Sequence, residues 1–454
     1  MLWCQKPGIT PPQVDQRVEL MSIVFRLAEA QEYTANRFPK YVDKIEAHFG
    51  PHKDHALIKY VKKKVRKRGV GYDAVMSMAI SITEPPHMEA LQPFSATFPE
   101  ARWGEKRATK FLVLLNEFYQ DSQAEQFFKT NEALYALASQ GFNKNYEELD
   151  LDWYTAFYGA PPQSTFKIIN GLGNGGGNYG PKLTLSNGEE LVYAIMGTWS
   201  VDSLGQPQYP LNSYFPTLLH EFNHSFVNHV VEKFHDDLKG SGQSIYQSVA
   251  KRMRSQAYGT WETMYAEAVV RASVIKYLQD HEYNPAYIKE ELNTQINRGF
   301  IWTPELVKEL DRYDQQRDQF PDLESFMPEI VKFFDRTAER IKEIEANIEA
   351  QRPQIISIAP FKNGDSNVDP QLKVIVVTFD RPMLGKGYSI NYGKGGKKTF
   401  PEMGEITYSE DFKSITIEIE LEPGSTYEFI LMGKAFRAKT GLGIKDYAIR
   451  FKTK

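Results

Sequence analysis

Two histidines and a glutamate within one short segment carry the clearest chemistry in the sequence. His220, Glu221 and His224 form the pattern H-E-x-x-H inside NSYFPTLLHEFNHSFVNHVVEKFH. Histidines four residues apart project from the same face of an α-helix, so both imidazoles can bind one metal ion. The glutamate next to the first histidine is in position to act as a general base. This spacing predicts a catalytic Zn2+ site in which Glu221 accepts a proton from a metal-activated water.

The segment that carries these residues has the signals of a helix. Pro216 suits a first helical turn, and Asn212 or Ser213 can cap the helix. Apolar residues recur with helical spacing at Leu218, Leu219, Phe222, Phe226, Val230 and Phe234. We therefore expect a helix of about five or six turns.

A catalytic zinc site needs a third protein ligand and an open position for water. Metzincins take this ligand six residues after the second histidine, following a glycine, but here those positions are Val230 and Val227. The segment AYGTWETMYAEAVVRASVIKYL, which has the apolar spacing of another helix, supplies Glu262 and Glu267 as candidates. Periodicity alone does not choose between these two glutamates.

The two segments together resemble a known group of proteins. HEFNHSFVN, followed further along the chain by YGTWETMYAEAVVRA, is similar to an uncharacterised family of secreted bacterial proteins with gluzincin-type zinc metallopeptidase character, over about residues 15–350. The resemblance implies that Glu267 is the third zinc ligand, with Arg271 one turn later, and it leaves Glu262 as the alternative. It also implies an enzyme that hydrolyses peptide bonds in a protein or peptide substrate.

Neighbouring residues complete the expected site. Peptide hydrolysis needs an electrophile for the oxyanion besides the metal, and Tyr258 matches a family position, with Tyr265 nearby; packing in the core is the alternative for both. Asn228 continues the histidine face by four residues and is placed for a hydrogen bond to a ligand. His229 lies off that face, where the family usually has proline, and we expect it to be structural or solvated, with a substrate contact as the alternative.

The elements that must position these residues follow from the apolar pattern. Helical spacing runs from Arg17 to about Tyr158, and again from Pro210 to about Ala350. Between these regions, STFKIIN and ELVYAIMG are β-rich runs separated by a segment with seven glycines. We therefore expect a mixed sheet of two or three strands before the H-E-x-x-H helix, and a helical lobe after it.

The glycine-rich segment contains Gly171, Gly173 and Gly176 in the G-x-G-x-x-G spacing of dinucleotide-binding loops. Such a loop must lead into a helix, whereas Pro181 and another strand-like run follow here. We therefore interpret the segment as a mobile hairpin that can form a flexible rim over a cleft.

Beyond Arg352 the pattern is β alone, and Ile415, Ile417, Ile419 and Leu421 alternate with polar residues. The opening of this region, PQIISIAPFKNGDSNVDPQLKVIVVTFDRPM, resembles bacterial immunoglobulin-like modules, which usually act as spacers, anchors or binding domains. The predicted fold class is α+β in three parts. Residues 1–16 are an N-terminal extension, 17–351 a zincin-like metallopeptidase domain with a helical lower lobe after about residue 213, and 352–454 an all-β immunoglobulin-like sandwich.

Composition excludes several classes of protein. Lys and Arg total 54 against 58 Asp and Glu, for a formal charge of -4, so electrostatic binding to nucleic acid is not expected. Cys4 is a single cysteine in a terminus expected to be disordered, and it can form neither an intrachain disulfide nor a thiolate cluster. No run reaches the roughly 18 apolar residues of a transmembrane segment.

A signal peptide is not recognisable at the start of the chain. A secreted, periplasmic or cell-surface location is therefore implied only by the resemblances. The alternative function is a non-catalytic cell-surface protein, in which the zincin scaffold positions loops and the sandwich binds glycan or protein. The presence of Glu221 favours the enzyme, because neither binding nor structural zinc requires a general base.

Overall fold

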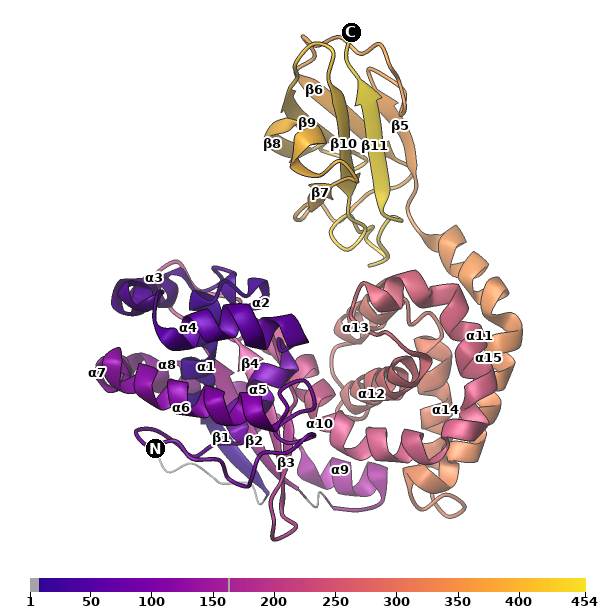
Figure 1. Cartoon of the computed structure of the whole chain (residues 1–454). Coiled ribbons are helices and arrows are strands. Elements are labelled where there is room, and N and C mark those ends of the chain that lie inside the picture. The colour runs from indigo at the N-terminus through magenta and orange to yellow at the C-terminus, as the bar shows by residue number, and fades with distance from the viewer. Residues whose placement is uncertain (1–7, 162–163) are drawn as a thin grey trace. The chain divides into compact units, whose positions relative to one another are not determined.

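The structure is a computed structural model that describes residues 8–161 and 164–454 (Figure 1). Cys4, which we expect in a disordered terminus, lies outside these residues. The chain divides into two compact units, residues 1–230 with 320–324, and residues 231–319 with 325–454. Helices followed by late β-sheets confirm the predicted α+β class.

The first unit confirms the helical pattern predicted between Arg17 and Tyr158. Its helices in this region are α1 (Gln16–Leu27), α2 (Gln31–Thr34), α3 (Pro39–Phe49), α4 (Ala56–Tyr60), α5 (Asp73–Ile80), α6 (Glu105–Asp121), α7 (Ala124–Thr130), α8 (Glu132–Glu147) and α9 (Leu151–Tyr158). Asp15 caps α1, because its carboxylate accepts a hydrogen bond of 2.8 Å from the backbone N–H of Arg17. Most of α1 is buried, so this helix belongs to the core of the unit.

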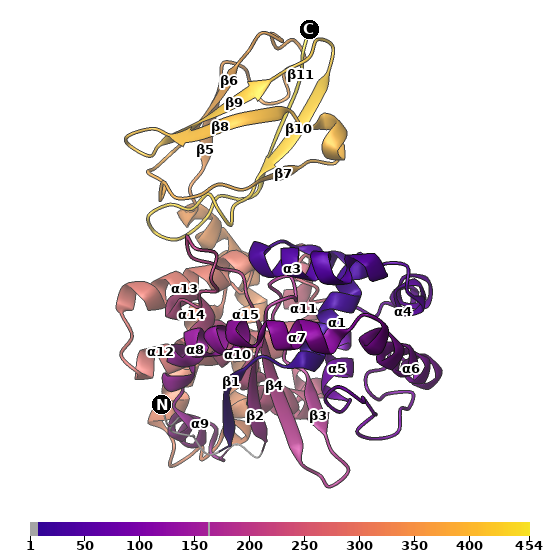
Figure 2. The ribbon, with the colours of Figure 1, turned by 90° about the vertical axis from the view of Figure 1, so that its left-hand side faces the viewer.

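The predicted mixed sheet is present in the first unit and has four strands in the order β1-β2-β4-β3 (Figure 2). Its strands are β1 (Ile9–Gln13), β2 (Thr165–Gly171), β3 (Lys182–Thr184) and β4 (Glu190–Gly197). β1, β2 and β4 run parallel, and β3 pairs antiparallel with β4. β4 is buried from Leu191 to Gly197, as expected for an interior strand that is covered on both faces.

Two expectations for this region need correction. Residues 1–16 are predicted to be an extension, yet β1 forms an edge of the sheet. Pro11 and Pro12 conceal this strand in the sequence, because proline lacks the N–H of a strand interior and is confined to edges. The first part of the glycine-rich segment, residues 172–181, is not a hairpin, since β2 pairs with β4 and not with β3. It is a crossover from an interior strand to the opposite edge, and the segment then ends in the turn of the antiparallel β3–β4 hairpin, which includes Gly188.

The helical region predicted after Pro210 is also confirmed. Its helices are α10 (Leu211–Lys233), α11 (His235–Arg254), α12 (Trp261–Asp280), α13 (Pro285–Arg298), α14 (Thr303–Gln315) and α15 (Leu323–Gln351). α10 carries the H-E-x-x-H residues and starts one residue earlier than Asn212. Pro216 therefore lies inside the helix, about one turn later than predicted. α12 is buried on nearly all sides between Trp261 and Leu278.

In residues 355–452, all of which the structure describes, the regular elements are strands and one short 3-10 helix. The strands are β5 (Ile355–Ala359), β6 (Val374–Phe379), β7 (Ile390–Tyr392), β8 (Glu402–Tyr408), β9 (Ser414–Glu420), β10 (Thr426–Leu431) and β11 (Tyr447–Lys452). They form two antiparallel sheets, β11-β10-β7 and β5-β6-β9-β8. Ile415, Ile417 and Ile419 all enter the core that the sheets share, as their alternation predicts.

Candidate metal centre

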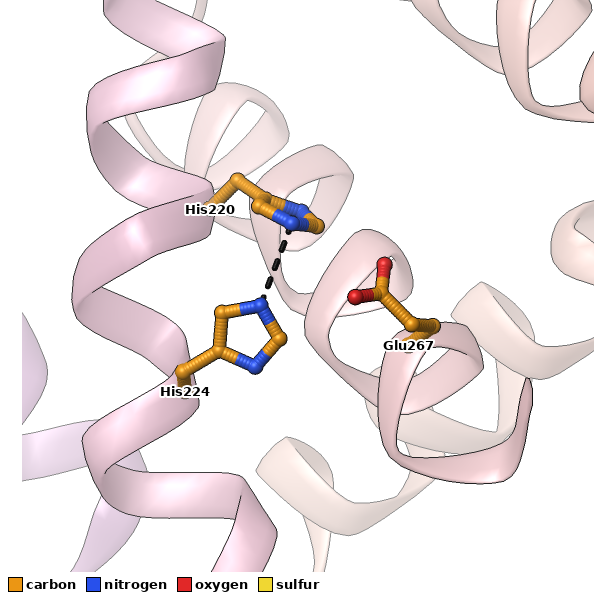
Figure 3. Close-up of side chains that lie close together, drawn as sticks. All are labelled: His220, His224 and Glu267. Atoms are coloured by element: carbon orange, nitrogen blue, oxygen red, sulfur yellow. Dashed lines mark hydrogen bonds between the residues drawn. The ribbon is translucent and has the colours of Figure 1, made fainter. Parts of the chain in front are cut away.

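The two histidines of the motif and one glutamate lie together (Figure 3). His220, His224 and Glu267 each offer one ligand atom, and these atoms lie within 4.8 Å of one another. The Nε2 atoms of the two histidines are 3.2 Å apart. Two imidazoles bound to one tetrahedral zinc ion at about 2.0–2.1 Å would hold these atoms about 3.3 Å apart. The imidazoles are therefore already spaced to share a metal ion.

The chemistry of this group fits a metal centre. Two imidazole nitrogens and one carboxylate oxygen are the donors found in catalytic zinc sites that keep a fourth position for water. The histidines are half-buried and Glu267 is buried, with 6% of its surface exposed. The three side chains can hold a metal ion.

Asn228 orients one of the histidines, as predicted. Its side-chain Oδ1 lies 3.1 Å from Nδ1 of His224. When Nδ1 carries the imidazole proton it donates to this oxygen and leaves Nε2 as the metal ligand. His229, the next residue, is exposed. This agrees with its predicted position away from the ligand face.

A buried arginine orients the glutamate. Nη2 of Arg271 donates to Oε2 of Glu267 at 2.7 Å, and Nη1 donates to Oε1 of Gln295 at 2.9 Å. Arg271 is only 3% exposed, so this ion pair is shielded from water. Loss of either partner leaves an uncompensated buried charge, which typically costs about 3–5 kcal/mol. Arg271 was expected one turn after the ligand, but its second partner Gln295 has no signal in the sequence.

Tyr258 lies beside this ion pair. Its hydroxyl accepts a hydrogen bond of 2.7 Å from Nη2 of Arg271 and also bonds to Glu267. Burial raises the pKa of the phenol, and the positive charge of Arg271 opposes that rise. These contacts make Tyr258 a positioning residue for Glu267. Its predicted role as an electrophile stays a prediction.

The other candidates lie apart from the three ligands. Glu262 is exposed, and its Oε1 is 3.5 Å from Nε2 of His235. Tyr265 is fully buried and stacks on Phe334 with ring centroids 4.0 Å apart, so it is a packed aromatic residue. The structure thus groups Glu267, and not Glu262, with the histidines.

Glu221 is half-buried on α10 and contacts the glycine-rich crossover. A methyl group at Gly180 would lie 2.5 Å from Oε2 of Glu221, closer than a real side-chain carbon can approach. Residue 180 must therefore lack a side chain for the carboxylate to occupy this position. The glycine cluster was the only sequence signal of this contact, and spacing did not reveal it.

The start of the crossover is bound to a buried carboxylate. Glu19 accepts hydrogen bonds from the backbone N–H groups of Leu172 at 2.7 Å and Gly173 at 3.0 Å. Burial raises the pKa of Glu19 to about 7, although the two backbone hydrogen bonds oppose this rise. Glu19 therefore ties the crossover to α1.

Two asparagines hold the rest of the crossover. Asn174 accepts from the N–H of Gly176 at 3.1 Å and donates to the carbonyl of Gly177 at 2.7 Å. Asn178 accepts from the N–H of Gly197, at the end of β4, at 3.0 Å. The segment interpreted as a mobile rim is therefore fastened at several points. The asparagine side chains between the glycines make these hydrogen bonds. Glycine content alone predicts a flexible segment, because it takes no account of these asparagines.

Comparison with known proteins gives a family but no activity. Residues 12–333 match the family described as "Domain of unknown function (DUF4932)". No curated protein matches the chain. Among the residues that the structure describes, no helix combines the length and the apolar character needed to cross a membrane.

Among solved structures, two of the similar chains are of the surface-layer protein SbsC. Domains 1–6 of that protein match with 17% identity and a TM-score of 0.18, over 52% of this chain and 33% of that chain. The N-terminal part of the bacterial S-layer protein SbsC matches with 14% identity and a TM-score of 0.17, over 53% of this chain and 58% of that chain. The chain therefore spans less than two thirds of either relative. At such TM-scores the likeness supports no conclusion about fold or function.

Proposed function

Because this chain belongs to the DUF4932 family, whose description assigns no activity, we propose from its site that it is a zinc-dependent peptidase. One observation carries the proposal. His220, His224 and Glu267 present their ligand atoms within 4.8 Å of one another, and Glu221 is the immediate neighbour of the first ligand. A purely structural metal site has no use for a carboxylate in that position.

The metal would supply Lewis acidity and lower the pKa of a water molecule to about 7. Glu221 accepts a proton from the attacking water and delivers it to the amine of the leaving group. Contact with Gly180 restricts this carboxylate on one side. Asn228 selects the tautomer of His224, and Arg271 orients Glu267. The substrate is a peptide bond in a protein or peptide.

The proposal includes a secreted, periplasmic or cell-surface location. The similarity of the H-E-x-x-H region to secreted gluzincin-type proteins supports it. So does the similarity of the C-terminal strands to bacterial immunoglobulin-like modules, which would provide contact with glycan or protein.

The variant Glu221→Gln tests the chemistry separately from metal binding. Glutamine keeps the size and hydrogen-bonding reach of the side chain but accepts no proton at neutral pH, and the three ligands are untouched. We expect the parent zinc content, and a decrease in peptide hydrolysis of about 10²- to 10⁴-fold. Zinc is measured by elemental analysis, and hydrolysis by mass spectrometry of a peptide library.

The matched control is Glu232→Gln, because Glu232 is an exposed glutamate on the same helix. This variant should cleave at the parent rate. Cleavage by Glu221→Gln at the parent rate, with contaminating proteases excluded, would refute the mechanism. Stoichiometric zinc with no cleavage by the parent protein across the library would instead support the non-catalytic surface protein.

A further inference from the structure

A cavity of about 570 Å³ lies in the first unit, lined in part by the glycine-rich crossover that contacts the proposed general base. Its walls include the glycine-rich crossover and the aromatic residues Tyr72, Tyr179 and Trp199. Tyr179 precedes Gly180, which contacts the carboxylate of Glu221, and consecutive Cα atoms are about 3.8 Å apart. The cavity wall therefore continues along the chain into the residue that contacts Glu221.

The unpaired charge at the cavity is that of one arginine, Arg37. Glu32 and Arg37 both line it, but Arg66 binds both carboxylate oxygens of Glu32, and the Glu32 side chain is only 4% exposed. Arg37 is exposed, and in the described part of the chain no acidic side chain forms an ion pair with it. The acidic wall is thus neutralised, and the Arg37 guanidinium has its donors available for a ligand.

A second donor and an aromatic platform face the same space. Asn178 uses its Oδ1 to accept from Gly197, which leaves its amide nitrogen as a donor at the cavity wall. Trp199 is half-buried and stacks on Tyr214 with ring centroids 3.6 Å apart and an angle of 3° between the ring planes. The hydroxyl of Tyr214 also accepts from the backbone N–H of Trp199 at 2.9 Å. The indole is therefore held rigidly where it lines the cavity.

Another aromatic residue of the cavity wall, Tyr72, is held in a strained backbone conformation. Tyr72 has φ of 51° and ψ of -125°, a region that non-glycine residues rarely adopt. Its carbonyl accepts from the hydroxyl of Tyr33 at 3.0 Å, and its side chain is 60% exposed. The fold thus retains an exposed aromatic ring at the cavity at the expense of backbone strain, as binding sites commonly do.

The cavity walls are also preformed. A methyl group at Gly175 would overlap the carbonyl oxygen of Glu32, and one at Gly197 would lie 2.5 Å from backbone atoms of residues 176 and 177. The crossover packs against its neighbours without side chains at these positions. A ligand therefore meets walls that need little ordering, which lowers the entropic cost of binding.

We propose that this cavity is a substrate subsite for a carboxylate, in which Arg37 and the amide of Asn178 bind the charged group and Tyr72 and Trp199 enclose its apolar stem. A guanidinium with unused donors selects a planar carboxylate. The carboxylate belongs either to an acidic side chain or to the C-terminus of the peptide. The inference rests on the proposed peptidase function, because it assigns the ligand as part of the same substrate.

The test uses the full-length, zinc-loaded Glu221→Gln protein, in which hydrolysis should be about 10²- to 10⁴-fold slower. The binding of three pentapeptides, each blocked at its N-terminus, is compared by calorimetry and by tryptophan fluorescence. One has a central glutamate and an amidated C-terminus, one has glutamine and a free C-terminal carboxylate, and one has glutamine and an amidated C-terminus. At least one carboxylate peptide should bind at least tenfold more tightly than the uncharged peptide, and which one binds identifies the source of the carboxylate.

The substitution Arg37→Gln should abolish this preference, whereas Arg68→Gln, at an exposed arginine outside the cavity, should retain it. Trp199→Phe should remove the fluorescence change. Equal binding of all three peptides, or a preference that survives Arg37→Gln, would overturn the subsite. Hydrolysis is measured in parallel with the parent protein. Cleavage of all three peptides at equal rates refutes the subsite alone, and Arg37-dependent binding without any cleavage refutes the peptidase while the carboxylate site stands.

Discussion

Gly180→Ala is the most direct test of the contact between the glycine-rich crossover and the proposed base. The added methyl would lie 2.5 Å from Oε2 of Glu221, and ordinary van der Waals contact begins at 3.4 Å. The carboxylate must therefore move by about 0.9 Å, the difference between these distances, or the crossover must yield. The crossover is fastened by Glu19, Asn174 and Asn178, so we expect the flexible glutamate side chain to move.

The expected effect is on the rate and not on metal binding. A misplacement of about 1 Å can reduce catalysis about 10²-fold, so kcat should fall between about 10- and 100-fold. The metal ligands His220, His224 and Glu267 are unchanged, and zinc content should remain that of the parent. Gly180 is exposed and does not need a positive φ, so the free energy of unfolding should change little.

The assay compares kcat, zinc content and urea unfolding for the parent, Gly180→Ala and Gly50→Ala. Gly50 is the control, because nothing lies within 4 Å of a methyl group placed there and its φ is -50°. A parent-like kcat for Gly180→Ala, in a protein whose activity is lost in Glu221→Gln, would refute the inferred contact. A large loss of zinc would show that the methyl disturbs the ligands and not the base.

His220→Ala should lose bound zinc, and Glu267→Gln should weaken zinc binding sharply in a competitive titration, whereas Glu262→Gln should leave it nearly unchanged. For Glu19, a folded-state pKa of about 7 against an ordinary 4.5 means that the folded protein prefers the protonated acid. Stability should therefore fall by about 3 kcal/mol as the pH rises from about 4.5 to 7, and Glu19→Gln should remove this decline in urea unfolding. A fragment of residues 353–454 should fold alone with a β-type circular dichroism spectrum, because its core is internal to the two sheets.

Zinc affinity that depends on Glu262 and not on Glu267 would show that the third ligand is wrongly assigned. Parallel stability curves for the parent and Glu19→Gln would show that this carboxylate does not titrate differently in the folded state. An unfolded fragment would mean that the sandwich depends on α13, where Asn293 donates to the carbonyl of Thr440 at 2.7 Å.

Local periodicity was sufficient for the features that depend on residues close in the chain. An i,i+4 spacing places His220 and His224 on one helix face regardless of what surrounds the helix, and the same geometry places Asn228 within reach of His224. The alternation of apolar and polar residues likewise predicts one buried face for Ile415, Ile417 and Ile419, which all enter the sandwich core. The helical and β regions were predictable for this reason.

Only the tertiary structure decided which residues far apart in the chain lie beside one another at the site. Glu262 and Glu267 both lie on α12, and the packing of that helix, not its sequence, turns Glu267 toward the histidines and pairs it with Arg271. The pairing of β2 with β4 instead of β3 turned a presumed hairpin into a crossover that touches Glu221. Such contacts join residues dozens of positions apart, and their energies depend on how the whole core packs, which no local pattern records.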